Sequence, residues 1–246
     1  MVESFRLGFR GGVEKAAALG VAGIQKYATG EELNWTDAQI KEALDIVKSN
    51  GLVFSAICGD FGYGFDNPDK NPEMIEKSKR VLDIAKKLEC DIVTTHIHKV
   101  PVEECEQKEI MRKACRELAV YADSIGSAFA LETGPEFGEV LGGFLDSLGA
   151  NGVRVNFDPA NLVMVAGDRP ENALKYIGKY VVPPMPRTVS SCTSPLKAKL
   201  SSVKKLWHTL NWPRWVTNIW NCLWVRAALT STYTCLLWLL PVSTVS

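Results

Sequence analysis

The sequence predicts an α/β protein with the architecture of a (β/α)8 TIM barrel. Short runs rich in β-branched and aromatic residues alternate with amphipathic helical segments through the first 182 of the 246 residues. The runs are almost continuously apolar, which is typical of parallel strands covered on both faces. A doubly wound open sheet would share this alternation, but no glycine-rich phosphate-binding sequence follows any predicted strand. The barrel is therefore the favoured fold.

The strands are predicted in order along the chain, after a first strand that would end near Ser4. They are Gly23–Tyr27, Val53–Cys58, Ile92–His96, Ala128–Glu132, Val153–Asp158 and the beginning of another at Tyr180–Val182. This makes about seven strands, and closure of a barrel of roughly 250 residues needs an eighth. We therefore expect an incomplete barrel, with its first strand clipped, its seventh disrupted and its eighth missing.

Helices are predicted between these strands from their caps and apolar spacing. Gly12–Leu19 would end at Gly20, because glycine readily adopts the left-handed conformation that follows a helix. Thr36–Asn50 would begin at Thr36 and end before Gly51. The next helix would begin at Asn71–Pro72, with Asn71 as its N-cap. Apolar residues at helical spacing predict three more, around Met111 to Ile125, Glu139–Leu148 and Glu171–Ile177.

Composition changes abruptly after Val182. No Asp or Glu follows Glu171, and six of the seven tryptophans lie in residues 183–246. A globular segment would normally contain about a quarter charged residues of both signs. We therefore predict one domain at residues 1–182 and no independent domain at residues 183–246. The alternative is a genuine basic, tryptophan-rich appendage.

Other features of the chain predict a cytoplasmic protein that acts on a small molecule. The first residues lack the apolar stretch of a signal peptide. The cysteines before Val182 show neither CxxC nor zinc spacing, which indicates free thiols in a reducing compartment. The uncharged segment Ala227–Ser246 contains several Ser and Thr and a proline, unlike a membrane span. We expect no nucleic-acid or membrane partner, and leave formation of a homo-oligomer open.

Polar side chains at the carboxyl ends of the predicted strands define a candidate site, because this end of a barrel carries the active site. A carboxylate that ends a buried strand is costly unless it is paired, hydrogen-bonded or bound to a cation. Two such groups, Glu132 and Asp158, together with histidines from other strands, suit a divalent metal such as Mn, Mg, Co or Zn. Alternatively, each carboxylate caps the helix or loop that follows it. The complete set is Cys58, Asp60, His96, Glu132, Asp158 and Asn161.

His96 and Asn161 are the candidate substrate-binding residues. His96 stands at a strand end, where histidine is as often a hydrogen-bonded scaffold residue as a substrate contact. Asn161 could reach a ligand hydroxyl or fix the turn within VNFDPAN. Two weaker candidates are Tyr27 and Lys26, and strand alternation predicts that Lys26 points outward.

At these residues the chain resembles the sugar phosphate isomerase/epimerase family, which lies within the xylose isomerase-like TIM-barrel superfamily. The resemblance rests on VTTHIHK, FALETGPE and VNFDPANLVMVAGD, and it spans Ser4–Val182. The superfamily also contains inosose dehydratases, ketose 3-epimerases and endonuclease IV. The resemblance implies that Glu132 and Asp158 are the first two ligands of a divalent metal ion and that Glu132 is the catalytic residue.

The tail regains motifs of the same family when its codons are read in another frame. With plausible codons and one inserted base, Pro183–Val189 becomes HTHAKDG, and Leu223–Ser231 becomes PLGEGGVDF in the shifted frame. The resemblance implies that a third metal ligand, a histidine, would fall where Met185 stands, and that a fourth, a glutamate, would lie past the end. We predict a one-base deletion near codon 183 and expect the chain as written to be inactive.

The resemblance implies a metal-dependent isomerase or epimerase that acts on a sugar or sugar phosphate by removing a proton next to a carbonyl. The metal would stabilise the enediolate oxygen as a Lewis acid, and Glu132 would be the general base. An inosose dehydratase-type lyase, which begins with the same step, and a non-functional truncated product are the alternatives. An endonuclease IV-like phosphodiesterase is less favoured, because three histidines are few for several zinc ions.

Overall fold

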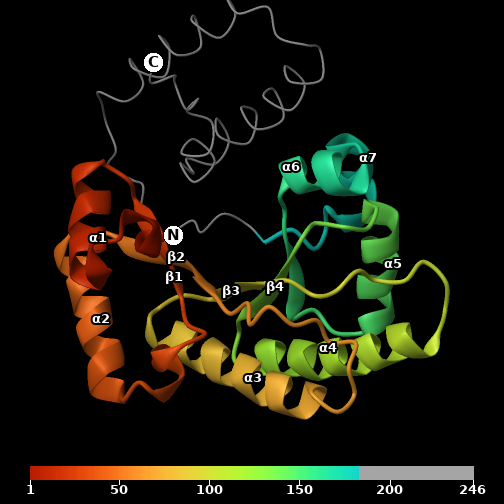
Figure 1. Cartoon of the computed structure of the whole chain (residues 1–246), viewed down its shortest axis with the longest axis horizontal. Helices are drawn as coiled ribbons and strands as arrows, with labels where there is room; N and C mark the ends of the chain where they lie inside the picture. Colours follow the sequence, from red (N-terminus) through yellow and green to blue (C-terminus); the bar gives the residue numbers. More distant parts are fainter. Residues whose placement is uncertain (183–246) are drawn as a thin grey trace, which may run out of the picture. The chain divides into compact units, whose positions relative to one another are not determined.

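Five parallel strands in sequence order form the sheet of the computed structural model, which describes residues 1–182 (Figure 1). Each strand pairs in parallel with the next one along the chain. This sequential order, with a helix in every crossover, is that of a barrel wall and agrees with the predicted fold class. The strands are β1 (Gly23–Tyr27), β2 (Val53–Cys58), β3 (Ile92–Thr95), β4 (Ala128–Glu132) and β5 (Val153–Asn156).

Helices occupy the crossovers and cover one side of the sheet. Figure 1 shows α3 and α4 lying side by side along it, and these two helices contact each other. Apolar side chains of the strands and helices, such as Phe54, Leu82, Leu118 and Phe129, are fully buried, and burial of a side chain of this size stabilises a fold by about 1.5–3 kcal/mol. The long helices are α1 (Gly8–Ala18), α2 (Asp37–Ser49), α3 (Asn71–Lys87), α4 (Glu106–Ser124), α5 (Gly138–Leu148) and α7 (Pro170–Ile177).

Short helical turns complete the described part of the chain. They are η1 (Val2–Phe5), η2 (Glu31–Asn34), α6 (Pro159–Asn161) and a π-helical turn, η3 (Leu162–Ala166). Residues 1–182 form one compact unit. None of its helices has the length and apolarity needed to cross a lipid bilayer. The predictions about the tail, the reading frame, the seventh strand beyond Val182 and the eighth strand lie outside the described residues.

The predicted start of α2 is confirmed in detail. The Thr36 side chain accepts a hydrogen bond from the backbone of Gln39, and the Gln39 side chain accepts one from the backbone of Thr36. This reciprocal capping satisfies two backbone donors that the first turn leaves free. Gly51 follows the helix with a φ of 71°, a left-handed conformation that favours glycine, as predicted.

Three local predictions were wrong. The helix expected at Gly12–Leu19 begins earlier, because α1 spans Gly8–Ala18. The residues around Ser4 form the 3-10 turn η1 instead of a strand, since the Glu3 side chain joins them to the backbone of Tyr27 without ladder pairing. Asn71 lies inside α3 and Lys70 is the N-cap. The Asn71 side chain is not free to cap because it donates to the carbonyl oxygen of Phe65.

Two strands end earlier than predicted, and this places the polar residues of the candidate site in loops. β3 ends at Thr95 and β5 at Asn156, so His96 and Asp158 lie just beyond the ladder. A parallel bridge between Val155 and Val181 begins a further strand position beside β5, as the sequence predicts for Tyr180–Val182.

Candidate active site at the carboxyl ends of the strands

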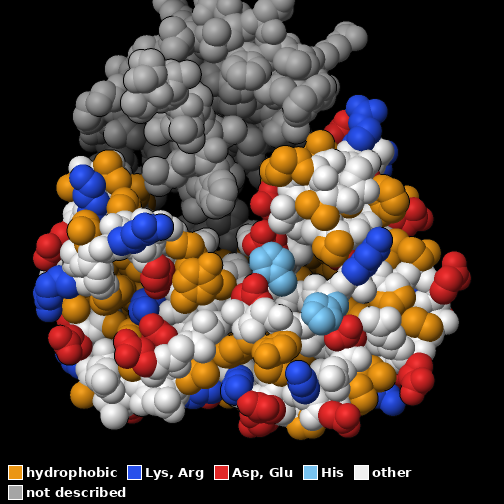
Figure 2. Space-filling model, viewed as in Figure 1, with side chains coloured by type: hydrophobic (Ala, Val, Ile, Leu, Met, Phe, Trp, Pro, Cys, Tyr) orange, Lys and Arg blue, Asp and Glu red, His pale blue; other side chains and the backbone are white. Residues whose placement is uncertain are grey.

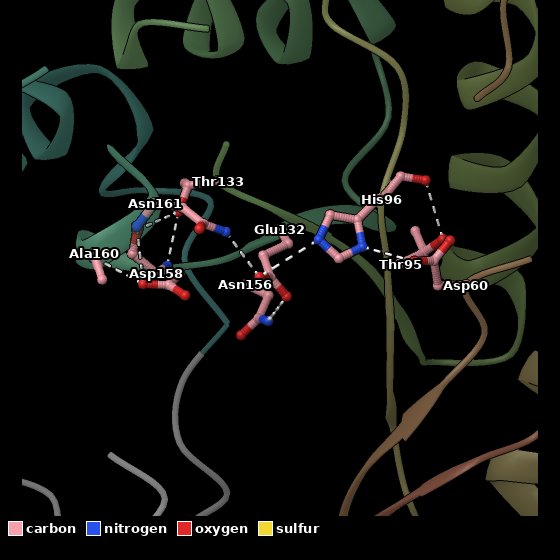
Figure 3. Close-up of polar contacts among 9 residues, drawn as sticks. All are labelled: Asp60, Thr95, His96, Glu132, Thr133, Asn156, Asp158, Ala160 and Asn161. Carbon is pink, nitrogen blue, oxygen red and sulfur yellow. Dashed lines mark hydrogen bonds and ion pairs between the residues drawn. The ribbon is translucent and has the colours of Figure 1, made fainter. Parts of the chain in front are cut away.

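The register of the sheet brings the predicted site residues to one edge. Cys58 is level with Thr94, Thr95 with Leu131, and Glu132 with Asn156. Glu132 is the last residue of β4, and His96 immediately follows β3. Parallel strands of this register end together, so side chains separated by many residues in sequence can contact one another (Figure 3).

His96 lies between two carboxylates. Its Nδ1 is 2.8 Å from Oδ2 of Asp60, and its Nε2 is 3.4 Å from Oε1 of Glu132 (Figure 3). The hydrogen bond with Asp60, followed by that with Glu132, raises the pKa of His96 to about 10. The hydrogen bond with His96 in turn lowers the pKa of Asp60 below its usual range. This pKa keeps the ring cationic at neutral pH, with one carboxylate at each ring nitrogen.

A second pair of a histidine and an aspartate lies beside the pair of His96 and Asp60. Nδ1 of His98 is 2.8 Å from Oδ1 of Asp66, and Gln107 donates to the other oxygen of Asp66. Both histidines are about half exposed, and Figure 2 shows histidine side chains next to acidic ones on this face. The two Asp–His pairs join the loop after β2 to the loop after β3.

The Glu132 carboxylate is held by three donors. Asn156 donates to Oε2 at 3.2 Å, Asn161 donates to Oε1 at 3.0 Å, and His96 approaches the same Oε1. The Glu132 side chain is only 24% exposed, so its charge is partly desolvated. The predicted residues Glu132, His96 and Asn161 therefore lie in direct contact, and the amide of Asn161 is directed at Glu132.

Asp158 lies one strand further along and is used differently. Its Oδ1 accepts hydrogen bonds from the backbone of Ala160 at 2.7 Å and of Asn161 at 3.2 Å, which caps α6. Its backbone is fixed by Thr133, whose hydroxyl both accepts from the N–H of Asp158 and donates to its carbonyl oxygen. One carboxylate oxygen thus takes the capping role that the sequence left open, and Oδ2 has no hydrogen bond to the described residues.

The remaining candidates differ in their positions relative to the site. Cys58 is partly buried, and burial raises the pKa of its thiol. Tyr27 is 43% exposed, and its phenol pKa is raised by burial and then by nearby groups that include Cys58, Asp60 and Glu132. Tyr27 therefore lies close enough to the site to sense its negative charge.

Lys26 lies on the opposite face of β1 from Tyr27, as strand alternation predicts, but it is buried. Its ammonium group is 2.6 Å from a carboxylate oxygen of Glu32 and 3.4 Å from one of Glu3. The rings of Phe9 and Trp35 lie 5.4 Å from it. These contacts make Lys26 a scaffold residue that joins β1 to the short turns on either side of it.

Sequence reasoning missed Asn156 and Thr133, although both contact predicted site residues. Asn156 is level with Glu132 in the β4–β5 register, so a predicted pairing of the two strands would have found it. Thr133 is fully buried, and its hydroxyl group contacts the backbone of Asp158. Its importance depends on packing between two loops, which local sequence patterns do not reveal.

The described residues do not complete the predicted metal centre. No group of three or more His, Cys, Asp or Glu side chains within residues 1–182 is arranged to hold a metal ion. Glu132 and Asp158 offer carboxylate oxygens of the type that Mg²⁺ and Mn²⁺ prefer, but such ions usually need about six ligands. The other predicted ligands, at Met185 and past the end of the chain, lie outside the described residues.

The fold and the site together define an α/β barrel-type protein with polar residues gathered at the carboxyl ends of its strands. Comparison with known families makes this more specific. Residues 13–183 match the family described as xylose isomerase-like TIM barrel, and the chain belongs to that family.

Solved structures share this fold at low sequence identity. A xylose isomerase domain protein from Planctomyces limnophilus is 23% identical with a TM-score of 0.64, over 69% of this chain and 66% of the other. D-psicose 3-epimerase from Clostridium cellulolyticum H10, solved with D-tagatose, is 19% identical with a TM-score of 0.60, over 71% and 65%. A xylose isomerase-like TIM barrel protein from Mycobacterium smegmatis, in complex with magnesium, is 17% identical with a TM-score of 0.58, over 70% and 63%.

This chain therefore spans just under two thirds of the length of each of these three proteins. A comparison with curated proteins finds no match.

Proposed function

We propose that the site around Glu132 serves a cytoplasmic isomerase or epimerase that moves a proton next to the carbonyl group of a sugar or polyol. The observation that carries this proposal is the setting of Glu132. It is a partly buried carboxylate at a strand end, held by side chains from the β3 loop, β5 and α6. Family membership and the fold shared with D-psicose 3-epimerase support the proposal.

Glu132 is the proposed general base. Its carboxylate accepts a proton from the carbon next to the carbonyl, and the electrons of that C–H bond move onto the carbonyl oxygen to form an enediolate. Oε2 of Glu132 accepts one hydrogen bond, from Asn156, so a lone pair is free for the incoming proton. Return of a proton to the neighbouring carbon gives the isomer, and delivery to the opposite face of the same carbon gives the epimer.

His96 and Asn161 are proposed to position the reactants. The cationic ring of His96 is half exposed, so its positive charge can stabilise a substrate oxygen as negative charge develops there. The amide of Asn161 fixes Oε1 of Glu132, which directs the other oxygen of the carboxylate toward the substrate. Asp60 keeps the His96 ring oriented through its other nitrogen.

Before a cation is added, the carboxylates around Glu132 favour an uncharged polyhydroxy substrate over a phosphorylated one. The neighbouring acidic side chains are those of Asp60 and Asp158. The ring of His96 lies between the carboxylates of Asp60 and Glu132. Carboxylates and amides accept and donate hydrogen bonds to hydroxyl groups, but the carboxylates repel a phosphate. Lys26, the basic residue of β1, is turned away and paired with Glu32.

A divalent cation is the proposed cofactor, and when bound it would supply the positive charge that an enediolate oxygen needs. Glu132 and Oδ2 of Asp158 are the described oxygens that would hold it. The magnesium complex of the Mycobacterium smegmatis protein supports this choice. The described residues offer too few ligands on their own, so the proposal requires further donors from outside residues 1–182.

The function is tested by exchange of the substrate α-proton with deuterated water, followed by mass spectrometry over a panel of ketoses, ketose phosphates and inososes. The assay is run on the 246-residue chain and on a version with the frame restored after Val182. Exchange by the restored protein should fall by about 10²–10⁴ in Glu132→Gln, which keeps the size but removes the base. His96→Ala should leave metal binding intact and weaken substrate handling.

Glu139→Gln is the matched control, because Glu139 is an exposed glutamate at the start of α5 and should leave exchange unchanged. Exchange that persists in Glu132→Gln, or that is insensitive to a chelator, would overturn the proposal. A dehydrated product from an inosose would instead identify the lyase, which begins with the same proton abstraction.

A further inference from the structure

His98 lies at the same end of the sheet as Glu132 and has no part in the proton transfer proposed above. Its Nδ1 is 2.8 Å from Oδ1 of Asp66. Gln107 donates to Oδ2 of Asp66 at 3.0 Å, so both oxygens of that carboxylate are held. The His98 side chain is 53% exposed, and its Nε2 makes no hydrogen bond to the described residues.

The backbone of Gly64 holds the same ring from another side. A Cβ atom at position 64 would stand 2.2 Å from Cγ of His98 and 2.6 Å from its Cβ and Nδ1, which is closer than such atoms can approach. Gly64 is buried, and because it lacks a side chain the loop after β2 can come against the imidazole. The ring of His98 is therefore oriented by two contacts with this loop, and Nε2 is left for a ligand.

His98 shares its arrangement with His96. In both residues Nδ1 contacts an aspartate of the loop after β2, Asp60 for His96 and Asp66 for His98. Figure 2 shows the two histidine side chains of the described residues close together on one face. The Cα atoms of residues two positions apart are at most about 7.6 Å from each other. Because Nε2 of His96 contacts Glu132, the ring of His98 is a near neighbour of the side chain that reaches the proposed base.

The chemistry of the free nitrogen suits a hydroxyl group. A carboxylate only accepts hydrogen bonds, so Nδ1 of His98 donates to Asp66. Nε2 then accepts a hydrogen bond when the ring is neutral and donates one when it is protonated. A hydroxyl group can both donate and accept, so it pairs with either form of the ring. An ammonium group or a carbonyl oxygen pairs with only one of them.

We propose that His98 is a specificity-determining residue of the site: its Nε2 hydrogen-bonds a substrate hydroxyl group that lies further along the carbon chain than the carbon whose proton Glu132 removes. The role of His98 in the reaction rests on the proposed function, and it narrows the substrate class to sugars and polyols long enough to contact both residues. A ketohexose has hydroxyl groups well beyond the reacting carbons, whereas a ketotetrose does not.

Two substitutions of His98 separate contact with a ligand from a structural role. His98→Asn places an amide nitrogen near the position of Nδ1, so it can keep the hydrogen bond with Asp66 but lacks Nε2. His98→Gln places an amide near the position of Nε2 and gives up the bond with Asp66. Contact with a ligand predicts that His98→Asn loses affinity and that His98→Gln keeps most of it. A structural role predicts the reverse order.

Steady-state exchange of the α-proton by the frame-restored protein gives kcat and KM for a ketohexose and a ketotetrose. His98→Asn should raise KM for the ketohexose about three- to tenfold, which corresponds to the loss of one hydrogen bond, and should change kcat little. KM for the ketotetrose should stay the same. Glu139→Gln, at an exposed glutamate of α5, is the matched control and should alter KM for neither substrate.

Three results would overturn the role of His98. They are an unchanged KM for the ketohexose in His98→Asn, an equal rise of KM for both substrates, and a greater loss of affinity in His98→Gln than in His98→Asn.

NMR spectroscopy of the His98 ring reports binding without turnover. The 246-residue chain and the frame-restored protein are each titrated with a panel of ketohexoses and with a ketotetrose. At least one ketohexose should shift the ring signals in a saturable manner, and the ketotetrose at the same concentration should leave them in place. Ring signals that no ketohexose moves in either protein would also overturn the role of His98.

Failure of the proposed function would be seen separately. Saturable shifts of the His98 ring, without α-proton exchange on any substrate of the panel, would remove the isomerase proposal and leave His98 as a residue that binds polyols. Exchange that depends on Glu132 but has the same KM in His98→Asn would leave the proposed function in place and remove the role of His98.

Discussion

His96 and Glu132 stand 3.4 Å apart, Nε2 to Oε1, although they come from different strands of the sheet. Asp60 holds the other ring nitrogen of His96 at 2.8 Å, so the three side chains form a continuous row across the ends of β2, β3 and β4. Because both ring nitrogens are occupied by carboxylates, the orientation of the ring and its charge are set together.

Replacing Asp60 with asparagine should lower the pKa of His96, because Asp60 is the largest contributor to its rise to about 10. The protonated ring stabilises the fold fully below its unfolded pKa near 6.5, and this contribution is lost as the pH rises through about 10. Asp60→Asn should move the upper end of that window downward. An NMR titration of the His96 ring measures the change directly.

Asp66→Asn is the control for this titration, since it removes the equivalent partner from His98 and should leave His96 unchanged. A His96 pKa that is the same in Asp60→Asn and the native chain would contradict the prediction.

Lys26→Met should destabilise the fold by about 3–5 kcal/mol, because it leaves the Glu32 carboxylate buried without its cation. Both side chains of this pair are about one-tenth exposed, so water cannot replace the lost contact. Urea denaturation followed by circular dichroism gives the free energy of unfolding. The double variant Lys26→Met with Glu32→Gln should recover much of the loss, since no buried charge is left unpaired. Single and double variants of equal stability would show that the ion pair is not the cause.

The chain as written should bind divalent metal weakly or not at all. The described residues supply only two carboxylates to the predicted centre, and one oxygen of Asp158 already caps α6. Each missing ligand removes a large part of the affinity of a metal site. Calorimetric titration with Mn²⁺ measures this. Tight one-to-one binding that disappears in Glu132→Ala would show that residues 183–246 supply substitutes.

The nucleotide sequence across codons 181–190 should contain a one-base deletion. One inserted base near codon 183 should open a frame that encodes HTHAKDG and then GEGGVDF. Sequencing of genomic DNA and of the transcript decides the matter. An unrelated sequence in that frame would contradict the prediction of a deletion.

The sequence predicted the features of the fold that depend on neighbouring residues. Thr36 and Gln39 are three positions apart and form their cap from local geometry alone. β1, β2 and β4 have the predicted bounds, since their apolar runs are flanked by clear turn residues. The segment around Ser4 was mispredicted because its conformation depends on contacts of Glu3 with Lys26 and Tyr27 across the sheet edge.

The candidate site was predictable in its location but not in its internal contacts. The rule that polar residues gather at the carboxyl ends of strands selected Asp60, His96, Glu132, Asp158 and Asn161. For Asp158 the sequence left capping and metal binding open, because a single carboxylate can do both with different oxygens. The burial of Glu136, in the loop between β4 and α5, could not be predicted, because no local sequence pattern marks it.

The hydrogen bonds of Glu132 also have a consequence for the order in which the protein is assembled. Both amides that hold its carboxylate, Asn156 and Asn161, lie downstream in the chain. During synthesis from the amino terminus, β1 to β4 can dock one after another, because each strand pairs with its immediate predecessor. Until Asn156 has left the ribosome, however, Glu132 is without either partner, and the second partner follows only with Asn161. The hydrogen bonds that hold the Glu132 carboxylate can therefore be completed only after β5 and α6 have been synthesised.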